Sequence, residues 1–352
     1  MYDVWTTLRE NEGRGKTPRW RELPRVLQVS RVIQVSLACA AFSVLAATVA
    51  HGETLSYPTR PVRVVVPFLP GGVVDVMGRL IAQRLSEHLG QNFYIDNRGG
   101  GGGNLGAAVV QAAAPDGYTI LFTSSSFLVN PGVQKVPYEP IKGFAAITIT
   151  SASPSVLAVN PTESAKSVNE LVASIRQSPG KYSFASTGYG STPHLQGEMF
   201  KLAYKLDLVH VPFNGGGPAL QSTVSGHTPL TFAALPPAIP MVKEGLLRAL
   251  AVVGPERVAA LPDVPTMAEA GLPGFKSETI LLALAPAGTP RLIVDRLNEQ
   301  IGKVLREPEV LQKFAVLGFS AIGSSPEQTT QRIEDELVMW AKVAHDANLQ
   351  QQ

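Results

Sequence analysis

The sequence has almost no cysteine, because Cys39 is the only one among 352 residues. It lies inside an N-terminal apolar run, and if that run is removed the remaining protein has neither a disulfide nor thiol chemistry. The lack of disulfides does not argue against export, since a chain of this size builds a core large enough to hold a periplasmic domain together. Lipid attachment at Cys39 is disfavoured, because Ser36 stands where a lipobox usually has leucine.

An excess of charge of either sign is also missing. Residues 1–52 hold seven of the 30 Lys and Arg and four of the 28 Asp and Glu, so the rest of the chain carries a formal charge of −1. Such a chain has no basic field that would attract nucleic acid or an anionic membrane. A hydrophobic fraction of 45% instead indicates a compact globular protein, and the length favours two domains.

The N-terminus resembles an export signal. Four arginines between residues 19 and 31 precede the apolar run 32–50, which ends in small residues. This order is typical of a secretion signal. A membrane-anchoring helix is the alternative, since a run of about 19 residues can span a bilayer, but several polar residues weaken it. We predict a signal peptide with an extended basic region over residues 1–52, cleaved after Ala50 or Gly52, and a periplasmic mature protein.

Short β-branched runs alternate with amphipathic stretches along the rest of the chain. The continuous apolar run 62–68 predicts a buried strand, and apolar residues at helical spacing predict a helix over 75–89. This rhythm predicts an α/β fold with mainly parallel sheets in two lobes, between which the chain crosses more than once. Further predicted strands are 93–95, 118–122, 155–159, 182–185, 207–213, 230–233, 247–253 and 280–285. Further predicted helices are 106–114, 167–177, 194–203, 218–225, a short one at 266–269, 290–306 and 325–347. The predicted N-caps are Ser167, Thr266, Thr289 and Ser325.

Three connections from a predicted strand to a helix are rich in glycine, at residues 67–72, 186–192 and 212–217. In parallel sheets, ligands bind beyond the carboxyl ends of the strands. There the helix N-termini offer backbone N–H groups and a partial positive charge to an anion. Glycine also makes tight turns, and for any one loop that interpretation is preferred. Three such loops after buried strands predict a shared ligand site.

Motifs typical of enzymes are weak. The glycines at 99–103 match part of a dinucleotide fingerprint, but they follow the second strand of their unit, so we interpret them as a flexible turn and a helix start. Residues 187–191 are not a nucleophile elbow. No His, Cys and carboxylate cluster has metal spacing, and His194 and His210 are interpreted as structural residues. We predict a protein that is not an enzyme and needs neither a cofactor nor a metal.

An ordered series of short motifs runs from residue 57 to the C-terminus. It includes VPFLPGG at 66–72 followed by Asp75, APDGY at 114–118 and HVPF at 210–213. Further motifs lie at residues 57–61, 89–91, 97–98, 179–181, 186–188, 194–195, 247–252, 261–266, 269–271 and 285–290. In this order the series resembles the Bug-type extracytoplasmic receptors of the tripartite tricarboxylate transporter family.

The resemblance implies a type II periplasmic-binding-protein fold, with residues 53–155 plus 280–352 in one lobe and 156–279 in the other. It implies a solute-binding protein that captures a small organic acid by lobe closure for membrane transporter subunits, and we expect a monomer. The carboxylate would be held by loop backbone groups, hydroxyls and waters, without an obligatory arginine. The matching ligand-binding positions are Phe68, Gly71, Gly72, Asp75, Thr123, Ser124, Ser125, Ser186, Thr187, Ser191, His194, Phe213, Asn214 and Gly215.

Three departures from the family pattern bear on the ligand. The Asn-Arg-Pro-Gly pattern reads Asn-Arg-Gly-Gly at residues 97–100, which predicts a looser turn. Ser222 replaces a frequent aspartate. Ile280 and Leu282 replace a frequent tryptophan and glycine, which would reshape the pocket if their strand borders the cleft.

Two other functions stay open at this point. A ligand-sensing adaptor for a membrane sensor kinase needs the same closing cleft, so the sequence does not separate it from a transport receptor. An exported enzyme acting on organic acids needs a nucleophile–base pair or a metal cluster, which the motifs do not provide.

Overall fold

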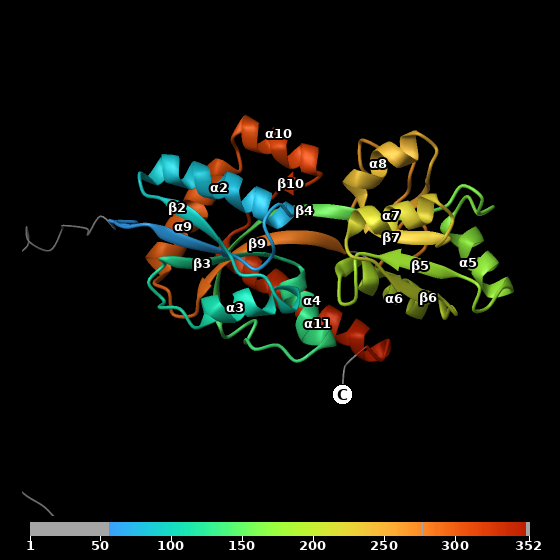
Figure 1. Cartoon of the computed structure of the whole chain (residues 1–352), viewed down its shortest axis with the longest axis horizontal. Helices are drawn as coiled ribbons and strands as arrows, with labels where there is room; N and C mark the ends of the chain where they lie inside the picture. Colours follow the sequence, from blue (N-terminus) through green and yellow to red (C-terminus); the bar gives the residue numbers. More distant parts are fainter. Residues whose placement is uncertain (1–55, 276, 350–352) are drawn as a thin grey trace, which may run out of the picture. The chain divides into compact units, whose positions relative to one another are not determined.

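The computed structural model describes residues 56–275 and 277–349. The predicted signal segment, with Cys39, lies outside these residues. Within them, ten strands form two mixed sheets that share one long strand, and helices cover the sheets (Figure 1). No helix in this part of the chain is both long enough and apolar enough to cross a bilayer.

The first lobe has the strand order β2-β1-β3-β9-β4. The first three strands pair in parallel, whereas β9 runs antiparallel to both of its neighbours. Its strands are β1 (Val62–Val66), β2 (Phe93–Asn97), β3 (Thr119–Ser124), β9 (Glu278–Pro286), the first part of β4 (Phe144–Val159) and the short β10 (Ser320–Ala321). Its helices are α2 (Val73–Leu89), η1 (Gly101–Gly103), α3 (Asn104–Gln111), α4 (Ser126–Val133), α9 (Arg291–Val304), α10 (Pro308–Leu317) and α11 (Pro326–Asp346).

The second lobe repeats this arrangement with the order β6-β5-β7-β4-β8. Again three strands are parallel, and the fourth is antiparallel to both neighbours. Its own strands are β5 (Ser183–Ser186), β6 (Val209–Pro212), β7 (Leu230–Ala234) and β8 (Arg248–Val253). Its helices are α5 (Val168–Gln177), α6 (Thr192–Tyr204), α7 (Gly216–Val224) and α8 (Leu235–Lys243). The two lobes therefore share one topology, although the sequence shows no internal repeat.

Strand β4 belongs to both sheets. Pro154 pairs with Glu278 of β9 in the first sheet, and the next residue, Ser155, pairs with Ala234 of β7 in the second. The chain leaves the first lobe here and returns to it at β9, so the prediction of more than one crossing is confirmed. The residue boundaries predicted for the two lobes stay a prediction.

The strand directions decide where a ligand could sit. Strands β3 and β4 are both antiparallel to β9, so β3 runs toward the second lobe, together with its parallel neighbours β1 and β2. Strand β7 is antiparallel to β4 and therefore runs toward the first lobe, together with β5 and β6. The carboxyl ends of all six parallel strands thus face the region between the lobes, and they carry the three glycine-rich loops with them.

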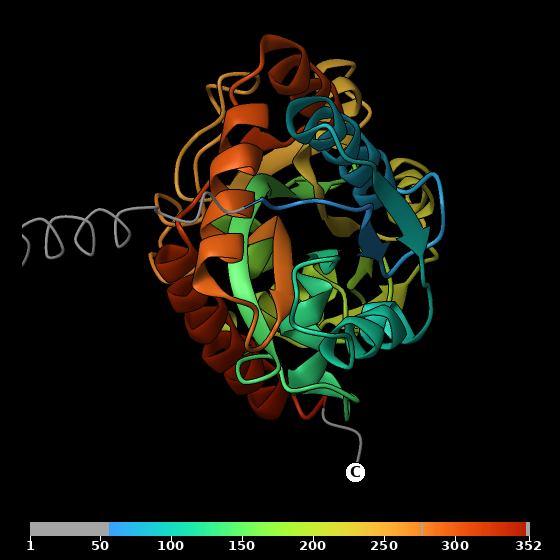
Figure 2. The ribbon, with the colours of Figure 1, turned by 90° about the vertical axis from the view of Figure 1, so that its left-hand side faces the viewer.

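Each sheet is buried on both faces, which explains the continuous apolar runs in its strands. In the first lobe, α2 and α10 lie on one side of the strands and α3 and α11 on the other (Figure 2). The core under α2, α9 and α10 includes Met77, Phe122 and Phe314. The core under α3, α4 and α11 includes Leu128 and Trp340, and the burial of Trp340 confirms that it packs the terminal helix.

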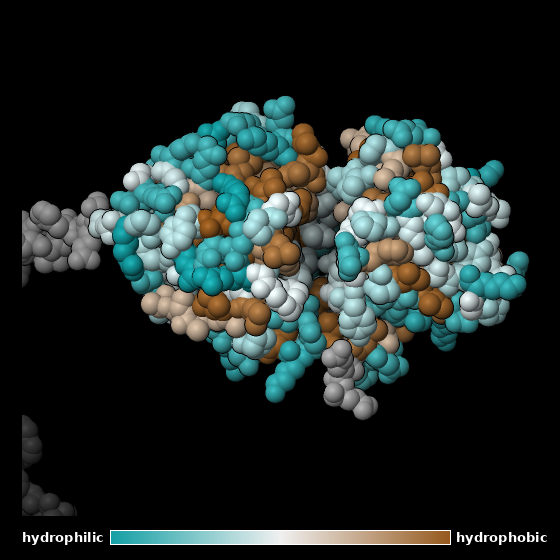
Figure 3. Space-filling view, viewed as in Figure 1, coloured by the Kyte–Doolittle hydropathy of each residue, from teal (hydrophilic) through white to brown (hydrophobic). Residues whose placement is uncertain are grey.

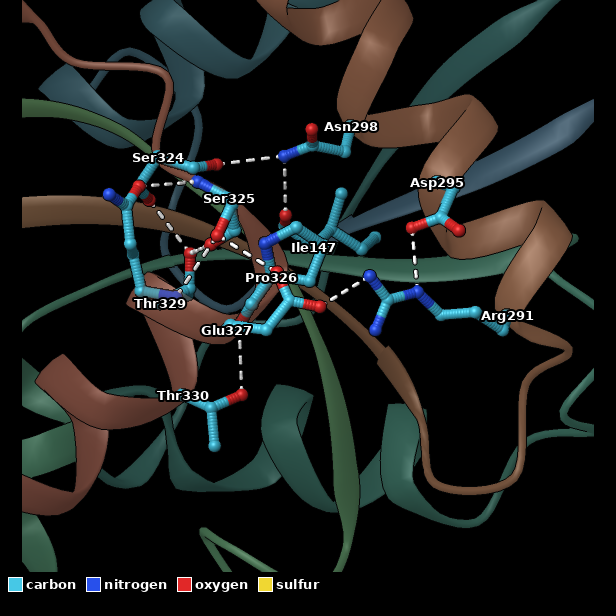
Figure 4. Close-up of polar contacts among 11 residues, drawn as sticks. Ile147, Arg291, Asp295, Asn298, Ser324, Ser325, Pro326, Glu327, Thr329 and Thr330 are labelled. Carbon is cyan, nitrogen blue, oxygen red and sulfur yellow. Dashed lines mark hydrogen bonds and ion pairs between the residues drawn. The ribbon is translucent and has the colours of Figure 1, made fainter.

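Helices α9 and α11 are attached to the end of β4 that is remote from the crossing (Figure 4). The side chain of Asn298 donates hydrogen bonds to the backbone oxygens of Ile147 (2.9 Å) and Ser324 (2.8 Å). The Ser325 hydroxyl accepts from the N–H of Gln328, whose side chain accepts from the N–H of Ser325. This reciprocal pair confirms the predicted capping box of the last helix.

Some predicted elements are wrong or missing. Strand β4 begins at Phe144, well before the predicted residue 155, and the alternation of Ile and Thr at residues 147–150 is a strand signal that the prediction did not use. Helices α4, α8 and α10 were not predicted. Pro131 stands inside α4, and α8 has prolines in its first turn and again at Pro240, so the local pattern argued against a helix in both cases.

Two predicted helix starts also differ. Thr266 and Glu269 form their reciprocal hydrogen bonds (2.7 and 3.1 Å), but they close only a turn, because a Gly-Leu-Pro-Gly segment follows at residues 271–274. Thr289 does not cap α9: Pro290 is the N-cap, and the Thr289 hydroxyl donates to the backbone oxygen of Pro286 (2.8 Å). The N-cap prediction at Ser167 is confirmed.

Candidate functional site

The surface of the molecule is hollowed between the two lobes (Figure 3). Of the six connections that the topology directs to this region, four carry the predicted ligand-binding residues: β1–α2, β3–α4, β5–α6 and β6–α7. Each of these residues lies in one of the four connections, at the end of the strand before it or in the first turn of the helix after it. A hollow between two lobes, lined by loops at the carboxyl ends of parallel strands, is the expected place for a ligand in an α/β protein.

The β1–α2 loop is held in shape by the buried carboxylate of Asp75. Its oxygens accept hydrogen bonds from the N–H of Gly71 (2.9 Å), from Arg79 (3.0 Å) and from the Asn97 amide (2.9 Å). The same Asn97 amide donates to the backbone oxygen of Phe68 (3.0 Å), so both ends of the loop are attached to one cluster. We call Asp75, Arg79 and Asn97 the ionic clamp.

The ionic clamp keeps Asp75 ionised. Burial raises the pKa of this carboxyl, but the hydrogen bonds from Arg79, Gly71 and Asn97, together with the charge of Arg79, outweigh burial, so the pKa lies below its usual value. Because these donors satisfy both oxygens, Asp75 supports the loop and offers little to a ligand.

The β5–α6 loop is held by neutral side chains instead. Ser186 bonds to the imidazole of His210 (2.7 Å), and its hydroxyl also accepts from the N–H of Gly188 (3.2 Å). Ser191 caps α6 and donates to the backbone oxygen of Gly188 (2.6 Å). Nδ1 of His194 accepts from the N–H of Gly190 (3.1 Å). We call Ser186, Ser191, His194 and His210 the imidazole clamp.

The two imidazoles of this clamp are stacked, with ring centres 3.9 Å apart. Burial, with a smaller contribution from the charges of His210 and Lys201, lowers the pKa of His194 to about 3. Burial and Lys201 lower the pKa of His210 to about 4. Both rings are therefore neutral at neutral pH, which His194 requires, because only an unprotonated Nδ1 can accept the Gly190 hydrogen bond.

Helices α2 and α7 begin at the cleft, one in each lobe, without a side-chain cap. Their N-caps are Gly72 and Gly215. The backbone N–H groups in the first turn of such helices have no intrahelical partner and lie at the positive end of the helix dipole. Each lobe thus presents free backbone donors to the hollow.

The glycines at these two helix starts have no packing role within the described residues. A Cβ on Gly217 would meet no atom within 4 Å, and one on Gly72 or Gly216 would meet only a single atom at 3.7 or 3.8 Å. None of the three has a positive φ. In contrast, a Cβ on Gly197 would overlap the ring of Phe184. Glycine at the helix starts therefore leaves the backbone N–H groups accessible from the cleft, where a side chain would hinder the approach of a ligand.

The run of five glycines forms a defined turn next to the first site loop. Residues Gly100–Gly103 all have positive φ, which only glycine adopts easily. The buried amide of Asn130 donates to the backbone oxygen of Gly102 (3.0 Å) and to Asn104 (2.8 Å), which fixes the turn on α4. The helix predicted over residues 106–114 is confirmed as α3, but it begins two residues earlier, at Asn104.

A family model for the tripartite tricarboxylate transporter family receptor matches residues 77–349. The chain belongs to this receptor family. Among curated relatives, the receptor is 37% identical over 82% of its length to a protein of the tcbD–tcbE intergenic region of Pseudomonas sp. strain P51, 86% of which is covered. It is 35% identical over 83% of its length to BugT of Bordetella pertussis, with 90% of BugT covered.

Solved structures agree with this assignment. The receptor is 38% identical to a periplasmic transporter, with a TM-score of 0.72 over 84% of this chain and 99% of that one. It is 35% identical to Rpa4515 of R. palustris with adipate (TM-score 0.71, 83% and 98% covered). It is 32% identical to MatC of Rhodopseudomonas palustris with bound malate (TM-score 0.68, 82% and 99% covered). The receptor is an extracytoplasmic solute-binding protein with the predicted two-lobed periplasmic-binding-protein fold.

The predicted site residues of the receptor separate into two groups. The first group has its polar atoms bound within the protein: Asp75, Ser125, Ser186, Ser191 and His194. Thr123 is likewise buried, in β3, and the Ser124 hydroxyl pairs with that of Ser126 (3.2 Å). The second group is exposed or half-buried at the loops: Phe68, Gly71, Gly72, Thr187, Phe213, Asn214 and Gly215.

Sequence reasoning missed four residues that shape the site: Arg79, Asn97, Asn130 and His210 as a partner of Ser186. The spacing of Asp75 and Arg79, four residues apart on one helix, was a usable signal for their pairing. The other three bond to segments that are distant in sequence, and no local pattern indicates them.

The departures from the family pattern can now be placed. Ile280 and Leu282 are fully buried in the core with α4 and α11, so they do not border the cleft. Ser222 is 7% exposed, and its hydroxyl accepts from Thr228 (3.1 Å) within the second lobe. None of these three side chains reshapes the site directly.

Proposed function

We propose that the receptor captures a small organic carboxylate between its lobes and passes it to the membrane subunits of a tripartite transporter. The observation that carries this proposal is the pair of open helix starts at Gly72 and Gly216–Gly217, one in each lobe. One carboxylate oxygen can accept from each helix start, so the ligand would draw the lobes together. The adipate and malate in the structures of Rpa4515 and MatC support this class of ligand.

Within this proposal the predicted residues take different roles. The backbone donors of α2 and α7, with Thr187 and Asn214, contact the ligand. The ionic clamp and the imidazole clamp hold the loops that carry these donors. Export by the signal over residues 1–52 is part of the proposal, and mass spectrometry of the mature N-terminus tests it.

A thermal-shift screen of di- and tricarboxylates, aromatic acids and amino acids on protein freed of bound ligand tests capture itself. A ligand at about 100 times its dissociation constant adds about 2.7 kcal/mol of stability, which a melting curve resolves easily. The absence of any shift across the screen would argue against the proposal.

Gly216→Ala tests the role of the open helix starts. The added methyl group makes only an ordinary contact with Thr187, at 3.8 Å, and no proline follows directly, so we expect the free energy of unfolding to stay the same or rise by about 0.4–1 kcal/mol. The dissociation constant of the ligand should rise by about tenfold or more, because the methyl group occupies the place of approach. Gly302→Ala in α9 is the matched control, with a similar gain in stability and unchanged affinity. Unchanged affinity of Gly216→Ala would remove α7 from the site.

A further inference from the structure

The polar side chains of the site loops are largely used within the protein. The hydroxyls of Ser186 and Ser191 bond to the β5–α6 loop, and the Ser125 hydroxyl accepts from the N–H of Ile280 (2.8 Å). In the described part of these loops, Thr187 and Asn214 are the polar side chains without a hydrogen-bond partner. A ligand that brings several hydroxyls or extra carboxylates would therefore leave most of them unpaired on closure.

The same loops present large apolar side chains. Leu69 follows Phe68 on the β1–α2 loop and is 77% exposed. Its side chain lies over the backbone of Gly99, at the edge shared by the first loop and the glycine turn. Phe68 and, from the opposite lobe, Phe213 are half-buried. Hydrophobic residues border the hollow on the side of the first lobe (Figure 3).

The side chain of Leu69 contributes little to the stability of the ligand-free protein, because most of its surface is in contact with water. Burial of that surface on lobe closure requires an apolar partner, either from the ligand or from the facing lobe. The four loops with predicted site residues also carry no Lys or Arg that could pair with a second or third carboxylate, and Arg98, on the neighbouring β2–η1 connection, is paired with Asp96 (3.0 Å). Apolar walls, backbone donors and few free polar groups together define a type of ligand.

We infer that the cleft selects organic acids with an apolar body, aliphatic or aromatic, over hydroxylated di- and tricarboxylates. The inference rests on the proposed function and narrows its ligand class. The carboxylate binds to the backbone donors, and the body of the ligand lies against Phe68, Leu69 and Phe213. Discrimination comes from the cost of burying an unpaired hydroxyl or carboxylate, which is sufficient for about tenfold or more per group.

Matched acids test the inference by isothermal titration. Succinate and malate differ by one hydroxyl, and adipate and citrate both have six carbons, while benzoate adds an aromatic body. We expect adipate and benzoate to bind at least about tenfold more tightly than citrate, and succinate more tightly than malate. Tighter binding of malate or citrate overturns the inference and leaves the proposed function standing. Binding of none of these acids overturns both.

Leu69→Ser tests the apolar wall. We expect the dissociation constant for adipate to rise roughly fivefold, with that for citrate unchanged, because part of an apolar contact is lost. Val338→Ser on α11 is the control, since Val338 is 73% exposed on an outer helix and its replacement should change neither affinity. An unchanged adipate affinity in Leu69→Ser, or an equal loss in the control, contradicts the role of Leu69.

Discussion

Two loops occupy the same position in the two lobes, after the first strand of each parallel trio, yet different chemistry holds them. The β1–α2 loop depends on the ionic clamp, in which a buried carboxylate collects charged and amide donors. The β5–α6 loop depends on the imidazole clamp, in which stacked neutral rings and serine hydroxyls form hydrogen bonds with the loop. Topology therefore decides where a site loop lies, while the side chains that stabilise it are free to differ.

The difference makes the two loops respond differently to acid. The ionic clamp needs Asp75 ionised, and its contribution is lost only as the pH falls through the lowered pKa of this carboxyl. The imidazole clamp needs His194 and His210 neutral, with pKa values of about 3 and about 4 in the folded protein and an ordinary value near 6.5 in the unfolded chain. At a pH between the folded and the unfolded pKa values, the two histidines bind protons in the unfolded chain but not in the folded protein.

The largest predicted effect follows from this imbalance. As the pH falls from 6.5 to 4.5, the free energy of unfolding should decrease by about 3–5 kcal/mol, since each pKa unit is worth about 1.4 kcal/mol per histidine. Urea unfolding at several pH values measures it. His194→Asn keeps an acceptor for the Gly190 N–H without a titrating ring, so its decrease should be about half as large. An equal pH dependence in both proteins would show that His194 is not the acid-sensitive group.

Removing the charge of the ionic clamp should have the next largest effect. Asp75→Asn places an amide where two donors point, so we expect a loss of about 2–3 kcal/mol in the free energy of unfolding and weaker ligand binding. Asp295→Asn is the control, because Asp295 forms the same kind of i,i+4 pair with Arg291 on the surface (Figure 4). The surface pair should contribute less than about 1 kcal/mol to the free energy of unfolding, and Asp295→Asn should leave the ligand affinity unchanged.

The smallest predicted effect concerns the helix caps, which also differ between the lobes. Helix α6 has the side-chain cap Ser191, whereas α2 starts at Gly72 without one. Ser191→Ala should lower the free energy of unfolding by about 1 kcal/mol and Ser191→Gly by only a few tenths. Glycine costs less because water can reach the free N–H groups of the first turn and because glycine readily adopts the N-cap backbone conformation. Thermal unfolding measures both. A larger loss for glycine than for alanine would mean that backbone rigidity of the loop, and not the cap, is what Ser191 provides.

Much of the fold could be predicted because its signals are local. The buried run in β1, the amphipathic spacing of α2 and the capping box at Ser325 each depend on a few neighbouring residues, and all three are confirmed. Helices α4 and α8 escaped prediction because their local sequence contradicts them. Helix α8 contains three prolines, and β4 continues through Pro154 because that residue stands where the strand changes sheets.

The placement of the three glycine-rich loops at the carboxyl ends of parallel strands was also predictable, because each follows a predicted strand. The roles of individual side chains were less so. Ser186, Ser191 and His194 lie at the β5–α6 loop of the candidate site, but their polar atoms are bound within the protein, through contacts such as that of Ser186 with His210, which joins separate strands. Whether a hydroxyl faces a ligand or its own loop depends on tertiary packing that no local pattern contains.

The shared strand β4 has a consequence for how such a receptor can be taken apart or recombined. Its first part completes one sheet and its last five residues, Ser155–Val159, lie between β7 and β8 in the other. A gene fragment that encodes either lobe alone would lack a strand of its sheet or carry a long unpaired edge. Exchange of lobes between relatives must therefore preserve this strand and its partners on both sides, and the two lobes should evolve and unfold as one cooperative unit.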